Sequence, residues 1–151
     1  MYFEDLTSYS YRLPFKLENV QNVGWLDSKH PYKHGSSSDE FLLSLRRIIC
    51  EQGITTNCHV NIVRGIHACN LCKSENIEIV CNRENVILGM SEIWIPNLYG
   101  YYAAPSMILH YVVDHGYRPP QCYIDAVIAF KATDPFNAQN IYDQLIARRL
   151  G

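Results

Sequence analysis

The amino-acid sequence predicts an α+β fold with a small antiparallel sheet and about four helices. Two observations predict it. Short runs with period-two alternation, separated by Asn, Gly and Pro, fill the chain between residues 58 and 102. Amphipathic stretches that carry helix-start and helix-stop residues lie on both sides of these runs.

Length and composition fit one folded domain. The chain has 151 residues, of which 48% are hydrophobic and 19% charged. A chain of this size buries roughly 68–70% of its unfolded surface, so it can form its own core. Disordered, collagen-like and coiled-coil classes are excluded. We expect a single domain over 1–151, with an extended N-terminal segment (1–36), a central core (58–118) and C-terminal helices (119–151).

The charge pattern narrows the choice of partner and compartment. The 13 basic and 15 acidic side chains give a formal charge of −2, and the basic ones form only two adjacent pairs, at 46–47 and 148–149. Such a chain lacks the basic patch of a general nucleic-acid binder. Every apolar run falls short of the ~18 residues of a membrane span, and residues 1–5 do not resemble a signal peptide. We expect a cytoplasmic protein that does not enter a membrane.

The first elements are predicted as follows. Residues 1–36 contain at most a short strand around 22–26, which Trp25 anchors to the core. A helix runs from Ser38 to about Glu51, because Ser37 and Glu40 form a capping box. Its apolar face repeats at helical spacing and leaves Arg46 and Arg47 in water. This face comprises Phe41, Leu42, Leu45, Ile48 and Ile49.

The later elements follow from alternation and from proline positions. Strands are expected at 58–63, 77–81, 86–88 and 91–95. Pro105 opens a helix that ends before Gly116. Pro119 and Pro120 open another, to about residue 131, and Asp134 with Pro135 caps a last one, to about residue 149.

Four of the six cysteines fall into two groups. A disulfide framework is not expected, because a chain with a good core and no signal peptide needs no such staples. Cys50 and Cys122 lie among apolar neighbours and are predicted to be small buried hydrophobes. Cys69 and Cys72 differ, since a C-x-x-C spacing forms a tight turn that directs both sulfurs to one point.

These two cysteines complete a metal-ligand pattern with two histidines. His110 and His115 lie on the last turns of the helix that follows Pro105. Two thiols from a turn and two imidazoles from a helix end form the ligand set of a Cys2His2 zinc site. The interval between the pairs is much longer than in a short zinc finger and holds the predicted strands. The sequence therefore predicts a zinc knuckle, inside the 58–118 core, pinned to the C-terminal end of a helix.

Other ligand sets remain open. His67, two residues before Cys69, is a possible alternative ligand, or a residue that orients a ligand by hydrogen bonding. Cys81 is a weaker alternative. A redox-active C-x-x-C pair needs a helix immediately after the motif, whereas here a turn and a strand follow.

The chemistry of the predicted site is structural. Four protein ligands leave zinc no open position for water or substrate, so the ion would stabilise the fold. Elsewhere Glu92, Asp114 and Asp125 are acidic candidates for general bases, but none lies in a recognisable arrangement with a nucleophile. We expect Asp114 to be a solvated helix residue.

Several motifs together resemble a known family. They are His67-Ala-Cys69-Asn-Leu-Cys72, Tyr102-Ala-Ala-Pro105 and His110-Tyr-Val-Val-Asp-His115-Gly-Tyr-Arg-Pro-Pro120. With the opening residues Met1-Tyr-Phe-Glu-Asp they resemble an uncharacterised family of small bacterial proteins, over most of residues 1–130. The resemblance implies that the two cysteines and the two helix histidines belong together. It implies no activity.

The function expected from these features is binding without catalysis. We expect a zinc-stabilised domain that recognises another protein, in its sharpest form an immunity protein that neutralises a bacterial toxin. A slightly acidic chain would suit a basic nuclease toxin. The first alternative is a metal-dependent hydrolase or nuclease, with a water molecule on an incompletely ligated metal. The second is a regulatory protein that reads nucleic acid through the histidine helix, whose exposed face lacks Lys and Arg.

Overall fold

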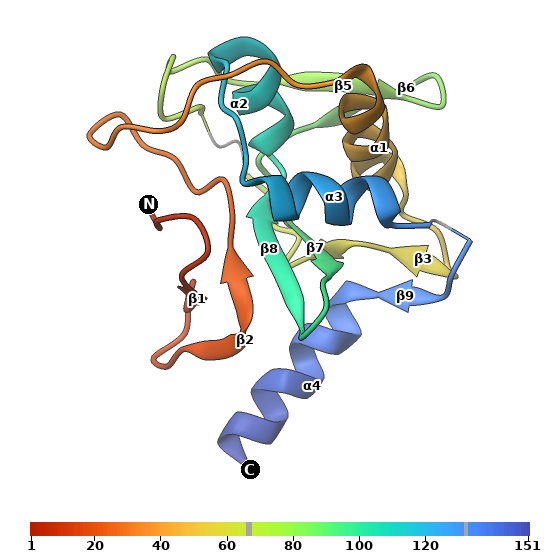
Figure 1. The fold of residues 1–151 in the computed structure, drawn as a ribbon. Coiled ribbons are helices and arrows are strands. Elements are labelled where there is room, and N and C mark those ends of the chain that lie inside the picture. The colour runs from red at the N-terminus through yellow and green to blue at the C-terminus, as the bar shows by residue number, and fades with distance from the viewer. Residues whose placement is uncertain (66–67, 132) are drawn as a thin grey trace.

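The computed structural model describes residues 1–65, 68–131 and 133–151 (Figure 1). Within them it contains four helices and nine short strands, which confirms the α+β class. The elements in chain order are β1 (Ser8–Tyr9), β2 (Leu17–Asn22), α1 (Asp39–Cys50), β3 (Thr56–Asn57), β4 (His59–Val60), β5 (Glu78–Cys81), β6 (Glu84–Ile87), β7 (Glu92–Pro96), β8 (Tyr101–Pro105), α2 (Ile108–His115), α3 (Gln121–Ala129), β9 (Phe136–Asn137) and α4 (Ala138–Leu150).

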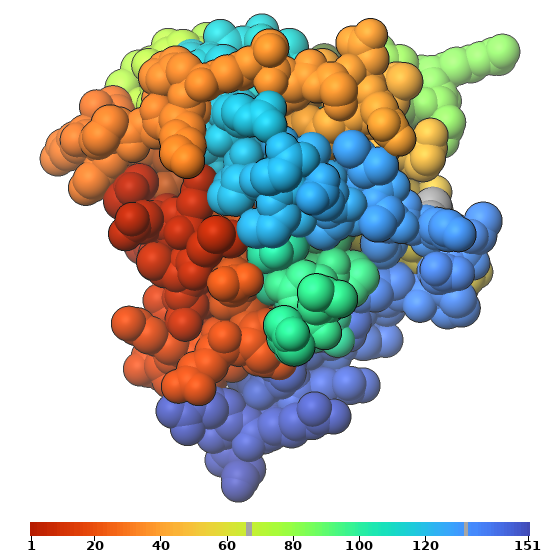
Figure 2. Space-filling model, in the orientation of Figure 1, coloured from red at the N-terminus to blue at the C-terminus, as the bar shows by residue number. Residues whose placement is uncertain are grey.

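The main sheet has five strands in the order β1-β2-β8-β7-β4. Its neighbours pair antiparallel, as predicted, apart from β2 and β8, which run parallel. That pair joins the N-terminal part of the chain to a strand about eighty residues later, so no local turn fixes its direction. The hairpin β5–β6 forms a separate antiparallel sheet, and its turn projects from the surface at the upper right of Figure 2.

Alternation along the central strands divides the core into two clusters. Ile93 and Ile95 of β7 belong to one cluster, while Trp94 between them belongs to the other. In β8, Ala104 belongs to the first cluster and Ala103 to the second. The first cluster includes the buried faces of α1, α2 and α3; the second includes the N-terminal strands and the start of α4, which extends away from the other helices (Figure 1). Both faces of the central strands are therefore buried.

The N-terminal segment contributes more to the sheet than predicted. The strand expected around 22–26 lies earlier, at Leu17–Asn22, and pairs on both sides. The local pattern does not reveal it, because its partners are β1 and the distant β8. Trp25 does anchor the segment: it is 7% exposed and its indole Nε1 donates to the carbonyl of Ala103 over 3.0 Å.

Two helix starts differ from the prediction by their capping residue. In α1 the N-cap is Ser38, whose Oγ accepts from the backbone N–H of Phe41. Ser37 Oγ is buried and, among the described residues, has no hydrogen-bond partner, so the predicted capping box does not form. In α4 the N-cap is Asn137 and not Asp134, because its Oδ1 accepts from the N–H of Asn140 over 2.9 Å. The predicted apolar face of α1 is confirmed, with both arginines exposed.

Pro105 does not open the histidine helix. It is the last residue of β8, a strand that the sequence analysis missed, and α2 begins only at Ile108. The two alanines at 103 and 104 carry little β propensity, but β8 is stabilised by pairing with β7 and β2 on its two edges. The described part of the chain contains no helix long and apolar enough to cross a membrane.

Candidate metal centre

The turn that carries Cys69 and Cys72 has the geometry of a metal knuckle. The backbone N–H of Lys73 donates to the carbonyl of Cys69, and the N–H of Cys69 donates to the carbonyl of Ser74, both over 2.9 Å. Lys73 closes the turn with a left-handed φ of 62°. The N–H of Leu71 donates to Cys69 Sγ over 3.3 Å. These bonds turn both sulfurs toward the same side of the loop.

Helix α2 delivers the two histidines. His110 lies on its buried face, 6% exposed, and His115 is its last residue. Gly116 follows in the left-handed conformation, with φ 62°, and its N–H donates to the carbonyl of Tyr111. The helix therefore stops where its second histidine meets the knuckle.

The structure brings all four predicted ligands together. Cys69 Sγ lies 3.5 Å from His115 Nε2, Cys72 Sγ lies 3.5 Å from His110 Nε2, and the two Nε2 atoms are 3.2 Å apart. The four ligand atoms all lie within 4.8 Å of one another. Two soft sulfurs and two imidazole nitrogens at this spacing could hold a metal ion.

Asp114 has a role that the sequence analysis did not assign. Its Oδ2 lies 2.7 Å from His110 Nδ1, one helical turn away. A carboxylate at Nδ1 fixes the tautomer that leaves Nε2 free to bind a metal. Asp114 is a solvated helix residue as expected, with its side chain 59% exposed, and it also contacts His110.

The two thiols differ in their electrostatics. A hydrogen bond to Ser74, together with the nearby histidines, lowers the pKa of Cys72 to about 5. Burial raises the pKa of Cys69, and the neighbouring Cys72 adds to the rise. A metal ion would supply the positive charge that a buried Cys69 thiolate needs. His67, the alternative ligand, lies outside the described residues.

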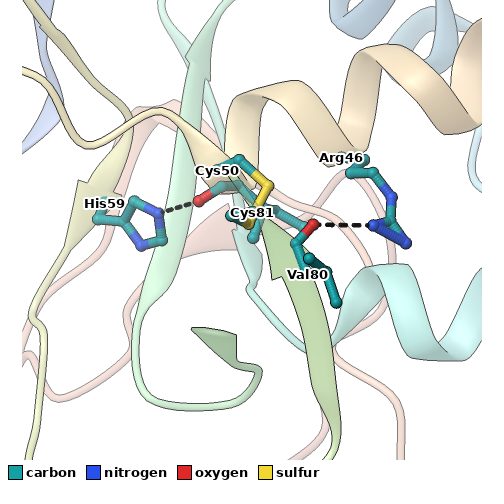
Figure 3. The surroundings of a disulfide bond; sticks show 6 residues. Arg46, Cys50, His59, Val80 and Cys81 are labelled. Atoms are coloured by element: carbon teal, nitrogen blue, oxygen red, sulfur yellow. Dashed lines mark hydrogen bonds between the residues drawn. A yellow bond between two sulfur atoms is a disulfide. The ribbon is translucent and has the colours of Figure 1, made fainter. Parts of the chain in front are cut away.

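Cys81, the weaker alternative, is excluded as a ligand because it forms a disulfide with Cys50 (Figure 3). The bond ties the end of α1 to the end of β5. Next to it, Arg46 Nη1 donates to the carbonyl of Val80 over 3.2 Å, and His59 Nε2 lies 2.7 Å from the carbonyl of Ile49. The prediction of Cys50 as a free buried thiol is wrong.

The other cysteine prediction also fails. Cys122 is exposed, not buried. Helix α3 packs its tyrosine, isoleucine and valine inward, at positions 123, 124 and 127, and position 122 falls on the outer side of that face. Asp125 is exposed as well and accepts a hydrogen bond from Gln121.

Glu92 is the acidic residue that the sequence analysis undervalued. It is 3% exposed, and its carboxylate accepts from the hydroxyl of Tyr9, the indole of Trp94 and the amide of Asn61. Burial raises its pKa, and the three donors oppose that rise. The burial of Glu92 could have been predicted, because the period of two in β7 places it on the same face as Trp94. Tyr9, 83 positions earlier, could not be inferred from it.

Comparisons with known proteins give a family and no further relative. Neither the curated proteins nor the solved structures contain a match. The family model described as "Domain of unknown function (DUF7919)" matches residues 1–128, so it covers both cysteines, both histidines, Glu92 and the disulfide. The α4 helix lies beyond the match. The resemblance to an uncharacterised family is thereby confirmed, and the chain belongs to the DUF7919 family.

Proposed function

We propose that the cluster is a closed, structural zinc centre. Tetrahedral zinc has bonds of about 2.3 Å to sulfur and about 2.0–2.1 Å to nitrogen. These place a sulfur about 3.5 Å from a nitrogen, and two nitrogens about 3.3–3.4 Å apart. The separations of 3.5, 3.5 and 3.2 Å in the protein support this assignment. Bound there, zinc would be held by Cys69, Cys72, His110 and His115.

A closed shell argues for binding without catalysis. With four protein ligands the ion has no position for an activated water, so it holds α2 to the knuckle. We infer that the protein is a zinc-stabilised domain that binds another protein. The single observation that carries this inference is the convergence of four possible ligand atoms within 4.8 Å of one another.

The turn between β7 and β8 supports a protein partner. Leu98 and Tyr99 are each 91% exposed there. The turn is fixed, because the N–H of Asn97 donates to the carbonyl of Gly100, and a Cβ on Gly100 would lie 1.9 Å from the carbonyl oxygen of Asn19. An exposed aromatic and an exposed leucine on a rigid turn suit a binding anchor, since the turn loses little backbone freedom on association.

The partner that we propose is a bacterial toxin, and the compartment the cytoplasm. The net charge of −2 favours a basic partner. Where a neighbouring gene encodes a toxin and the two chains co-purify after co-expression, Leu98→Ala with Tyr99→Ala should abolish the complex and leave the melting temperature unchanged. Leu43→Ala, an exposed leucine of α1, is the control and should keep it. A complex that survives the double substitution would contradict the anchor.

The coordination shell decides between binding and hydrolysis. Elemental analysis and X-ray absorption on the purified protein should give one zinc per chain, with two sulfur and two nitrogen ligands. A shell that contains water would overturn the closed site and favour a metal-dependent hydrolase.

The exposed face of α2 gives no support to nucleic-acid binding. It carries Val113 and Asp114 but neither Lys nor Arg, so it offers nothing to the phosphates of a nucleic acid.

A further inference from the structure

A cavity of about 210 Å³ lies beside Glu92, apart from the four metal ligands. Its described lining includes the side chains of Tyr11, Arg12, Trp25, Asn61 and Glu92. Trp25 is buried and Tyr11 half-buried, so the cavity presents aromatic surface. Arg12 and Glu92 are its charged side chains. The cavity thus combines a few convergent polar groups with apolar walls, as small-molecule sites do.

Glu92 is held in place with one acceptor position left. Its Oε1 accepts from Tyr9 and Trp94, over 2.7 and 3.2 Å, and its Oε2 accepts from Asn61 over 2.7 Å. An ionised carboxylate has about four acceptor positions. The remaining one lies on Oε2, the oxygen shared with Asn61, which also lines the cavity. This oxygen can accept one hydrogen bond from a bound ligand.

Arg12 places the opposite charge nearer to solvent. It is exposed, whereas Glu92 is 3% exposed, so the cavity is negative inside and positive toward its opening. The guanidinium lies 5.1 Å from the ring centroid of Tyr11. Arg12 has a left-handed φ of 59°, which costs energy for a long side chain.

The size of the cavity limits the ligand. A volume of about 210 Å³ is below the roughly 300–1,000 Å³ of typical small-molecule sites. A ligand of this size that satisfies both charges carries an ammonium for Glu92 and a carboxylate for Arg12. We propose that the cavity binds a free amino acid, or a zwitterion of the same size, with its ammonium on Glu92 Oε2.

The cost of burying Glu92 supports a functional role. Burial raises the pKa of this carboxyl above that of an exposed glutamate, which means that the ionised form is unfavourable in the folded chain. A cationic ligand group would restore a favourable charge balance.

The first test is a thermal-shift screen of the metal-loaded full chain with each standard L-amino acid. A concentration of about 10 mM detects any ligand with a Kd of about 1 mM or tighter. At least one amino acid should raise the melting temperature. Its N-acetyl derivative, which lacks the ammonium, and its decarboxylated amine should each bind at least tenfold more weakly by calorimetry. The absence of any stabilising amino acid would overturn the proposal.

Substitutions then locate the site. Glu92→Gln and Arg12→Gln should each lower the affinity for the amino acid at least tenfold, while the zinc content stays at its native value. Arg83→Gln is the matched control: Arg83 is also exposed and left-handed, with φ 70°, but lies in the projecting β5–β6 turn (Figure 2). It should bind normally. Equal losses in both arginine variants, or native binding by Glu92→Gln, would overturn the assignment.

The second variant keeps the test valid if Glu92→Gln does not fold. Arg12 is exposed and outside the buried core, so its substitution leaves the folding of the chain intact. The readout is also distinct from that of the zinc proposal. Loss of amino-acid binding at full zinc occupancy concerns the cavity alone, and loss of zinc concerns the knuckle.

Discussion

Two crosslinks of different chemistry hold the same part of the chain. The metal centre that we propose would fix the knuckle to α2, and the Cys50–Cys81 disulfide fixes the following hairpin to α1. With the metal bound, residues 69–81 would be joined to the helices by one coordination site and one covalent bond. The metal centre fails under acid or chelation, because its ligands must be deprotonated. The disulfide fails under reduction. The hairpin is therefore secured against conditions that would break either crosslink alone.

The largest expected effect is the loss of the metal. Cys72→Ser, His110→Ala or strong chelation should lower the free energy of unfolding by ~5 kcal/mol or more, because metal binding in a structural site is also folding energy. For 151 residues that is a fall in melting temperature of roughly 10–20 °C. Both substituted proteins should be poorly soluble. Calorimetry and metal analysis would measure the effect.

The control for this prediction is Cys122→Ser, which changes an exposed cysteine outside the cluster. It should keep both its metal and its melting temperature. If Cys72→Ser also melted within error of the native protein, the structural role of the centre would be refuted.

The second largest effect is the loss of the disulfide. Its cysteines are 31 positions apart, so the bond removes loop entropy worth about 3–4 kcal/mol from the unfolded chain. The double variant Cys50→Ala with Cys81→Ala should lose about that stability in chemical denaturation and keep a full complement of zinc. Loss of zinc in this variant would show that the two crosslinks are a single unit.

Counting free thiols tests whether the Cys50–Cys81 disulfide is formed in the cell. After metal removal and denaturation in the presence of an alkylating reagent, a chain that keeps the Cys50–Cys81 bond shows four labelled cysteines, and a chain whose pair is reduced shows six. Six labelled thiols would mean a reduced pair in the cell, which is the usual state of cytosolic proteins. Four would count against the cytoplasmic location.

The same comparison explains what the sequence could predict. The predicted metal ligands come as two local pairs, three and five positions apart, and each pair has a recognisable spacing. The disulfide joins cysteines 31 positions apart with no local signature, and it was missed. The fold divides in the same way: the helix faces and the hairpin follow local periodicity, whereas the parallel pairing of β2 with β8 and the bond from Tyr9 to Glu92 depend on distant contacts.

A smaller effect should appear at the carboxylate behind His110. Asp114→Ala removes the acceptor 2.7 Å from His110 Nδ1. It should lower the affinity for the metal by about 10–100-fold, as is typical when such a partner is lost. Competition with a chromophoric chelator would measure it. Asp125→Ala, an exposed acid on α3, is the control and should bind the metal normally. Equal affinities in both variants would refute the orienting role of Asp114.

The smallest effect concerns His59, beside the disulfide (Figure 3). Burial lowers its pKa, so the folded chain favours the neutral ring, which bonds Ile49 and Ser91. The unfolded chain takes up the proton first, below an unfolded pKa of about 6.5. Stability from His59 is therefore present above that pH and lost as the pH falls, by at most about 1.4 kcal/mol between pH ~7.5 and ~5.5. The native protein should exceed His59→Gln in free energy of unfolding by less as the pH falls. Urea unfolding of both proteins measures this difference, and the contribution of the metal is the same in each. A pH-independent difference would mean that the ring is not held neutral by burial.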